Sequence, residues 1–189
     1  MFKDLVLKNR SYRAFDESRP ITAQDMRALI DLARHVPSGM NKQPLRYRIV
    51  CEKDELAKML ANTRYAGALS IKLPPEGQKP TGFIVIFNDT ETGSPDFLSF
   101  KDCGIAAQTI LLGAAEMGFG GCMLASFNPA QLNADLDVPA RYQPVLAIAL
   151  GTPAESVVVE DADEMGAPYY RDEQNVHHVP KRKLEDILL

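Results

Sequence analysis

The longest helical pattern in the sequence runs from about Asp96 to Met117, and it limits the possible folds more than any other segment. Its middle, CGIAAQTILLGAAEMG, is apolar on nearly every face. A helix of this kind has to be covered on all sides, and one face of a sheet covers only part of it. We therefore expect this helix to pack against the chain's own sheet and against a second subunit, with Ile110 at the subunit boundary.

Shorter patterns predict the remaining elements. Thr22 and Asp25 resemble a capping box at the start of a helix, and Pro37 ends that helix because the residue before a proline avoids helical geometry. The apolar run FIVIF predicts a strand buried on both faces. The expected helices lie at 22–36, 53–62, 96–117 and 128–136, the expected strands at 46–51, 83–87, 120–125 and 144–151, and an irregular loop at 63–82. Because the order lacks a regular βαβ rhythm, it favours an α+β fold over a doubly wound sheet.

The composition fits one ordinary globular domain. The chain has 189 residues, 46 % hydrophobic and 24 % charged, so we expect a single domain over 1–189. A net charge of −4 argues against a nucleic-acid-binding surface. No stretch approaches the roughly 20 apolar residues of a membrane span, and the opening MFKDLVLKNRSYR has no signal-peptide pattern. Three cysteines without a C-x-x-C pair are typical of a reduced protein, and we expect a cytoplasmic location.

Two sequence patterns partly resemble known functional motifs but do not match them. The glycines at 118, 120 and 121 do not have the spacing of a dinucleotide fingerprint, and they follow a helix instead of opening one. The pair His177-His178 could suggest a metal site, but neighbouring residues on an extended chain point to opposite faces. No other histidine or cysteine lies near that pair in the sequence. We therefore expect no metal, and we expect the acidic residues between 155 and 164 to form a solvated surface.

Three polar clusters remain after these exclusions. The first is Arg10-Ser11-Tyr12-Arg13, in which two guanidinium groups could clamp a phosphate or a ring carbonyl. The second is the loop VPSGMNKQP at 36–44, which offers a hydroxyl and two amides between two prolines. The third is Lys181-Arg182-Lys183. Taken singly, each cluster is as well explained by a solvated basic turn, a hydrogen-bonded turn or a solvated charge run.

The order of the three clusters along the chain is more informative. An Arg-Ser-x-Arg near the start is followed by a helix, by Pro-Ser-Gly-x-Asn-x-Gln-Pro, by a strand, by a glycine-rich turn after a buried helix and by a basic element. This order resembles the nitroreductase family of flavin enzymes over nearly the whole chain. The residues that carry the resemblance are NRSYRAF, VPSGMNKQPLRYRIV, DCGIAAQTILLGAAEMGFGGCM, VLAIALGTPAE and PKRKLEDIL.

The resemblance implies a fold and a cofactor. The fold is a central, mainly antiparallel sheet flanked by helices, in an intertwined homodimer that binds FMN without a covalent link at the subunit interface. By position, Arg10, Ser11 and Arg13 would hold the phosphate and the pyrimidine side of the flavin, and Lys181 and Arg182 would complete the phosphate site. The loop that reaches in from the partner would contribute Pro37, Ser38, Gly39, Asn41 and Gln43. The turn at Leu124, Ala125 and Ser126 would lie along the ring.

The same resemblance implies an activity. Such proteins pass electrons from NAD(P)H to a small organic acceptor, such as a nitro compound or a quinone, in a ping-pong cycle. The flavin carries the chemistry, so we assign no catalytic side chain. We expect the tail 155–189 to pack on the partner or to close the phosphate site. The alternatives are a flavin carrier or sensor without turnover, and an FMN reductase of another specificity, for dehalogenation or enal reduction.

Overall fold

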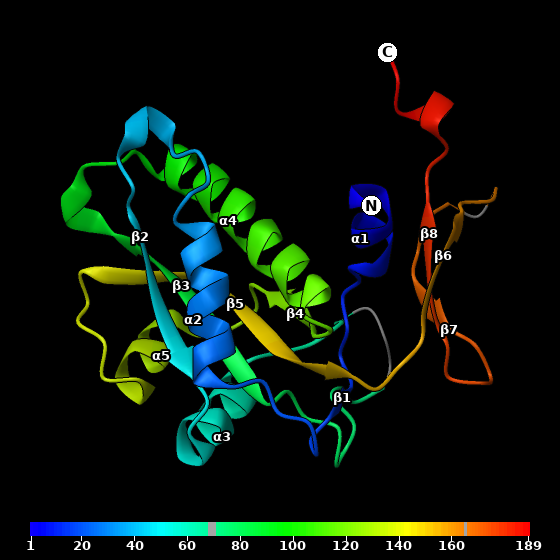
Figure 1. Cartoon of the computed structure of the whole chain (residues 1–189), viewed down its shortest axis with the longest axis horizontal. Helices are drawn as coiled ribbons and strands as arrows, with labels where there is room; N and C mark the ends of the chain where they lie inside the picture. The colour runs from blue at the N-terminus through cyan, green and yellow to red at the C-terminus, as the bar shows by residue number, and fades with distance from the viewer. Residues whose placement is uncertain (68–70, 165) are drawn as a thin grey trace.

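The computed structural model describes residues 1–67, 71–164 and 166–189. Its main body is a five-stranded sheet in which every strand pairing is antiparallel (Figure 1). The path β1-β5-β3-β2 joins Phe15–Asp16, Tyr142–Pro153, Gly82–Asp89 and Leu45–Val50, and β4, Gly120–Leu124, also pairs with β5. The sheet and its flanking helices confirm the α+β fold with a mainly antiparallel sheet.

The alternation of side chains along β3 divides the core into two halves. Ile84 and Ile86 face helices α2, Ala23–Ala33, and α4, Asp96–Glu116. Phe83, Val85 and Phe87 face the opposite side, where α3, Lys53–Asn62, and α5, Pro129–Asp135, supply the cover. All eight residues of β3 are buried, as the apolar run predicts for a strand with helices on both faces.

The local signals in the sequence set most helix ends. Thr22 and Asp25 form the expected capping box, and Asn128 caps α5 by accepting a hydrogen bond from the Gln131 amide. Gly118 follows α4 with a φ of +87°, the left-handed geometry that favours glycine after a helix. Helix α2 ends at Ala33, earlier than expected, because the chain already turns at Arg34 before it reaches Pro37.

Helix α4 is covered on only part of its circumference within one chain. Ile110 is 0 % exposed and lies in the core formed with α2 and the sheet, so its expected place at a subunit boundary is wrong. Ile105 is instead 43 % exposed, and Phe97 and Phe100 are each 61 % exposed. These side chains, with Gly104 and Gln108, recur at helical spacing along one uncovered face. We call this face the α4 stripe.

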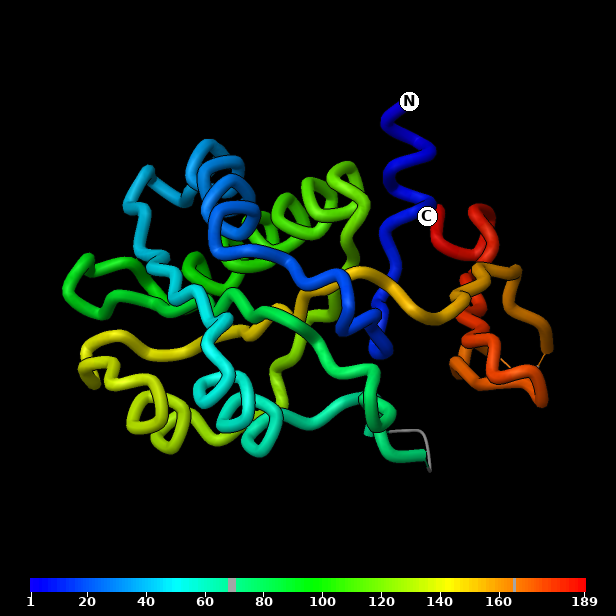
Figure 2. Tube along the Cα trace, turned by 60° about the horizontal axis from the view of Figure 1, so that its bottom comes forward, coloured from blue at the N-terminus to red at the C-terminus, as the bar shows by residue number. Residues whose placement is uncertain are grey.

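The C-terminal part of the chain forms a second, three-stranded sheet in the order β6-β8-β7. Its strands are Val157–Asp161, His177–Lys181 and Tyr170–Arg171, and β6 runs parallel to β8. Figure 2 shows this sheet beside α1, Phe2–Lys8, and outside the main body. The acidic segment expected as plain surface therefore contains a strand; residue 165 lies outside the described chain.

The described part of the chain also has three short 3₁₀ helices, at Gly39–Asn41 (η1), Thr90–Thr92 (η2) and Leu184–Asp186 (η3). The described residues of the expected loop at 63–82 hold no helix or strand before Gly82, which begins β3, and 68–70 lie outside the description. Among the helices that the structure describes, none has the length and apolar character to cross a membrane.

Candidate functional site

A cavity of about 300 Å³ lies where α1, α4, β4 and the C-terminal sheet meet. It brings together the first sequence cluster and part of the third, which are separated by most of the chain. Its size falls at the lower end of the range for small-molecule sites. The lining residues are Val6, Asn9, Arg10, Ser11, Arg13, Gln108, Leu111, Met123, Val157, Tyr169, His177, Val179 and Lys181.

The charge of this cavity has one sign. Arg10, Arg13 and Lys181 contribute three cations, and none of the described lining residues carries a carboxylate. Grouped cations without a neutralising carboxylate repel one another and favour an anionic guest. Arginine matches a phosphate with paired N–H donors, and lysine meets it as a point charge. The cavity is therefore suited to a phosphate group.

Several contacts fix Arg13 at the cavity. Its backbone amide and that of Ala14 both donate to the buried carboxylate of Glu155, the second over 3.0 Å. Its guanidinium group donates to the Ser11 carbonyl over 3.2 Å and lies 5.6 Å from the centre of the Tyr169 ring. A side chain held in this way loses little conformational entropy when it binds a ligand.

Two arginine nitrogens at this site have no internal partner. The Nε atoms of Arg10 and Arg13 are buried, and no described residue accepts a hydrogen bond from either of them. An unpaired buried donor costs about 1–3 kcal/mol. A guest that supplies acceptor oxygens removes this cost, which is a second reason to expect an anion here.

The end of β4 differs from the sequence expectation. Leu124 points into the core on the α3 and α5 side, and Ala125 and Ser126 are exposed beyond the strand. Met123 lines the cavity in their place, because successive side chains of a strand alternate between its faces. The alternation along GGCML could have identified Met123 once Leu124 was assigned to the core.

The two basic residues at the end of β8 and just after it also differ in their position relative to the cavity. Lys181 lines the cavity and Arg182 does not, although both residues are largely exposed. Gln108, Tyr169 and His177 line the cavity and were not predicted. Gln108 lies on the α4 stripe, Tyr169 directly precedes β7 and His177 begins β8. The position of the C-terminal sheet cannot be predicted from local patterns.

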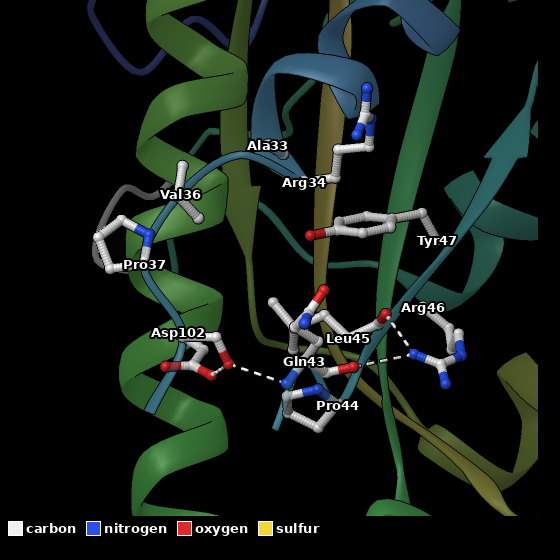
Figure 3. A pocket seen from close by; sticks show the side chains of 11 residues that line it. Ala33, Arg34, Val36, Pro37, Gln43, Pro44, Leu45, Arg46, Tyr47 and Asp102 are labelled. Atoms are coloured by element: carbon white, nitrogen blue, oxygen red, sulfur yellow. Dashed lines mark hydrogen bonds between the residues drawn. The ribbon is translucent and has the colours of Figure 1, made fainter. Parts of the chain in front are cut away.

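The loop at 36–44 lines a different pocket (Figure 3). The Ser38 hydroxyl donates to Asp102 of α4 over 2.6 Å and accepts a hydrogen bond from the Gln43 amide at 3.0 Å. The Gly39 amide donates to the same carboxylate over 3.0 Å. Asp102 is 4 % exposed. The hydroxyl of Ser38 is thus occupied within the chain, and its role is to hold the loop on α4.

This loop has an uncommon backbone. Met40, Asn41 and Gln43 all have positive φ angles, between 49° and 53°. Such geometry costs of order 1–3 kcal/mol for each non-glycine residue and persists where the surroundings enforce it. Asp102 holds Ser38 and Gly39 at the start of this segment, and the Ser38 hydroxyl accepts from the Gln43 amide at its end. The side chains of Met40 and Asn41 are exposed, and Gln43 donates to the Asn41 side-chain oxygen over 3.1 Å.

The loop and the cavity do not meet within one chain. They share no lining residue, and they contact different parts of α4, the loop at Asp102 and the cavity at Gln108 and Leu111. In Figure 1 the loop lies near the start of α4, whereas the C-terminal sheet lies beyond α1 on the other side.

His177 and His178 point to opposite faces of β8, as their adjacency predicts. His177 is buried at the cavity, where burial first, and then Arg13 and Arg171, lower its pKa. The ring of His178 lies between Glu160 and Asp172, at 2.9 and 3.2 Å, and stacks on Tyr170. The hydrogen bond to Glu160 first, and then that to Asp172, raises the pKa of His178.

Comparison with known proteins identifies the family of the chain. The sequence profile of the nitroreductase family matches residues 6–86 and 77–152. The chain belongs to the nitroreductase family.

One relative is Spy0809 of Streptococcus pyogenes serotype M6, a protein named for NAD(P)H nitroreductase activity. Its sequence is 28 % identical over 198 aligned residues, which cover 90 % of this chain and 94 % of the relative. A crystal structure of a nitroreductase from Desulfovibrio desulfuricans in complex with FMN has a TM-score of 0.73 at 23 % identity, over 99 % of this chain and 94 % of the other. A nitroreductase family protein of Streptococcus pneumoniae has a TM-score of 0.72 at 18 % identity, over 100 % and 99 %.

The contact between Ser38 and Asp102 makes a prediction about stability. Ser38→Ala should lower the free energy of unfolding by about 1.5–3 kcal/mol, the range for a hydrogen bond to a charged group. Urea unfolding of Ser38→Ala, Asp102→Asn and the double variant should give a coupling free energy of at least about 0.5 kcal/mol. Additive effects of the two substitutions would show that the contact does not hold the loop.

The two histidines predict opposite pH dependences of stability. The pKa of His178 is raised in the folded chain, so its contribution is full below about pH 6.5 and is lost as the pH rises through the folded pKa. The pKa of His177 is lowered, so its contribution is present above about pH 6.5 and is lost as the pH falls.

Urea unfolding from about pH 5 to 8 tests this. The stability difference between the unsubstituted protein and His178→Ala should shrink with rising pH, and the difference for His177→Ala should shrink with falling pH. Two differences with the same sign of slope would contradict the assignment.

Proposed function

We propose that this protein is an FMN-dependent oxidoreductase that passes electrons from NAD(P)H to a small organic acceptor. The observation that carries the proposal is the cation-lined cavity, with its two buried and unpartnered arginine Nε atoms. Membership of the nitroreductase family supports it, as do the relative named for NAD(P)H nitroreductase activity and the related structure that binds FMN.

The cavity residues fit the parts of FMN. Arg10, Ser11, Arg13 and Lys181 would hold the single phosphate, and Arg182 would add charge near the same site. Leu111 and Met123 offer an apolar wall to the flavin ring, and the exposed Ala125 and Ser126 after β4 would lie along its edge. The C-terminal sheet would close the phosphate site, since Tyr169, His177 and Lys181 already form one wall of it.

The chain's own residues would bind and orient the cofactor. Hydride transfer from a nicotinamide, and delivery of the electrons to an acceptor, is the chemistry that FMN supplies when bound. Arg10, Arg13 and Lys181 anchor it through its phosphate, and the fixed position of Arg13 sets the placement of the ring relative to α4. We assign no proton transfer to a side chain.

We also propose that the site is completed across the two-fold axis of a homodimer. The α4 stripe exposes several large apolar side chains on one face, which monomeric proteins rarely leave wet. A two-fold partner can cover such a face with the same face of its own. The loop at 36–44 would then present Pro37, Gly39, Asn41 and Gln43 to the partner's flavin, while Ser38 holds the loop on Asp102.

The cofactor test uses the purified full-length chain. Mass spectrometry of the flavin released by heat should identify FMN in stoichiometric amount, because the cations suit one phosphate. Anaerobic addition of NADH or NADPH should then bleach the flavin absorbance near its visible maximum. FAD, or no flavin affinity, would refute the proposed cofactor. Tightly bound FMN that neither nucleotide reduces would assign the protein as a carrier or sensor instead.

The dimer test uses the exposed Ile105 and not the buried Ile110. Ile105→Asp should give a folded monomer that loses FMN, because the charge is tolerated in the single chain but is buried without a partner in the dimer. Light scattering coupled to flavin absorbance measures both properties together. Leu32→Asp on α2 is a matched control, since Leu32 is 45 % exposed and lies outside the α4 stripe.

The control should remain a dimer with its flavin. An Ile105→Asp monomer that keeps FMN would show that one chain holds the whole site. An Ile105→Asp protein that remains a dimer would show that the interface lies elsewhere.

A further inference from the structure

His177 occupies the cavity in a way that its neighbours do not explain. It is the first residue of β8, it is 1 % exposed and it lines the cavity beside Arg13. A histidine buried to this extent has to satisfy both ring nitrogens or pay for an unpaired group. The two nitrogens of His177 therefore show what the site is built to hold.

The contact with Arg13 fixes the tautomer of the ring. The Nε2 atom lies 3.1 Å from Nη1 of Arg13. Arginine has only donors and stays charged, so Nε2 has to accept this hydrogen bond. The ring is then neutral, with its proton on Nδ1. Burial and the charges of Arg13 and Arg171 act in the same direction, since they lower the pKa of His177, whereas Glu155 acts against them and His178 adds to them.

The proton on Nδ1 has no acceptor within the described chain. Nδ1 is buried, and none of the described residues forms a hydrogen bond with it. It is the third unpartnered N–H at this site, beside Nε of Arg10 and Nε of Arg13. The described lining residues thus have three buried donors without a partner and no buried side-chain acceptor without one. This arrangement matches a guest that only accepts, with several oxygens.

The ring is held in place independently of any guest. The His177 amide donates to the Ser156 carbonyl over 2.9 Å, and the residue pairs with Val157 in the parallel β6–β8 ladder. The Tyr169 ring lies beside the His177 ring, with the two ring centres 5.4 Å apart and the ring planes at 58° to one another. A donor fixed before binding costs little entropy to use.

We propose that His177 is a ligand of the FMN phosphate, donating from Nδ1 to a phosphate oxygen while Nε2 accepts from Arg13. This assignment rests on the proposed function and adds a neutral donor to the cations of the site. It also makes His177 a positioning residue for Arg13, because one ring contacts both the guanidinium group and the anion. The imidazolium form cannot accept from Arg13, so the neutral tautomer is the one that builds the site.

Two substitutions separate the two nitrogens. In His177→Asn, the side-chain amide lies near the position of Nδ1 and keeps a donor there. In His177→Gln, the amide reaches the position of Nε2, so it keeps an acceptor for Arg13 and loses the donor to the phosphate. The dissociation constants of FMN and of riboflavin, which lacks the phosphate, are measured by quenching of flavin fluorescence on the flavin-free full-length protein.

We expect His177→Gln to weaken FMN binding by about tenfold or more, as for a hydrogen bond to a charged group, and to leave riboflavin binding unchanged. His177→Asn should weaken FMN binding less. Arg13→Ala should weaken FMN binding by about 10- to 150-fold, on the same scale. His178→Gln is the matched control on the opposite face of β8, and its FMN affinity should equal that of the unsubstituted protein.

The tautomer provides a readout that does not depend on flavin. Long-range ¹H–¹⁵N NMR of the flavin-free protein near neutral pH should show His177 protonated on Nδ1 alone, and Arg13→Ala should remove that preference. A ring protonated on Nε2, or a weaker FMN affinity for His177→Asn than for His177→Gln, would overturn the assignment. So would an equal loss of FMN and riboflavin affinity.

The outcomes also separate this inference from the proposed function. If the unsubstituted protein binds FMN and His177→Gln binds it equally well, the function stands and the role of His177 is refuted. If the unsubstituted protein does not bind FMN at all, the proposed function fails, and the assignment of His177 fails with it.

Discussion

The buried carboxylate of Glu155 ties together the three parts of the chain that form the cavity. It accepts hydrogen bonds from the backbone amides of Arg13 and Ala14, and it pairs with Arg171, whose side chain is also buried. These contacts join the N-terminal segment, the end of β5 and the C-terminal sheet. A carboxylate removed from water is stable only when its oxygens are fully paired. The geometry of the cavity therefore depends on all three segments being in place together.

Local signals in the sequence were sufficient for much of the fold. The run FIVIF identified β3, and Thr22 with Asp25 marked the start of α2, because burial on both faces and helix capping leave traces within a few residues. Local signals could not predict which side of α4 faces solvent. A helix that is apolar on every side has no polar face to mark its exposed side, so Ile105 and Ile110 could not be told apart before the packing was known.

The site shows the same division between local and distant information. Arg10, Ser11 and Arg13 are close in sequence and meet in the cavity, and Lys181 joins them from the far end of the chain. Asp102 and His177 were not predicted as site residues. Each acts through a contact with a residue more than sixty positions away, Asp102 with Ser38 and His177 with Arg13. No period or short motif records such a contact.

The cavity is lined both by the segment before β1 and by the C-terminal sheet, and this has a consequence for synthesis on the ribosome. Arg10 and Arg13 emerge early, but Tyr169, His177 and Lys181 emerge only after the whole main sheet has been made. A nascent chain can fold its core while this cavity still lacks one wall. Prematurely terminated products that stop before β8 would lack His177 and Lys181, two of the groups that line the cavity.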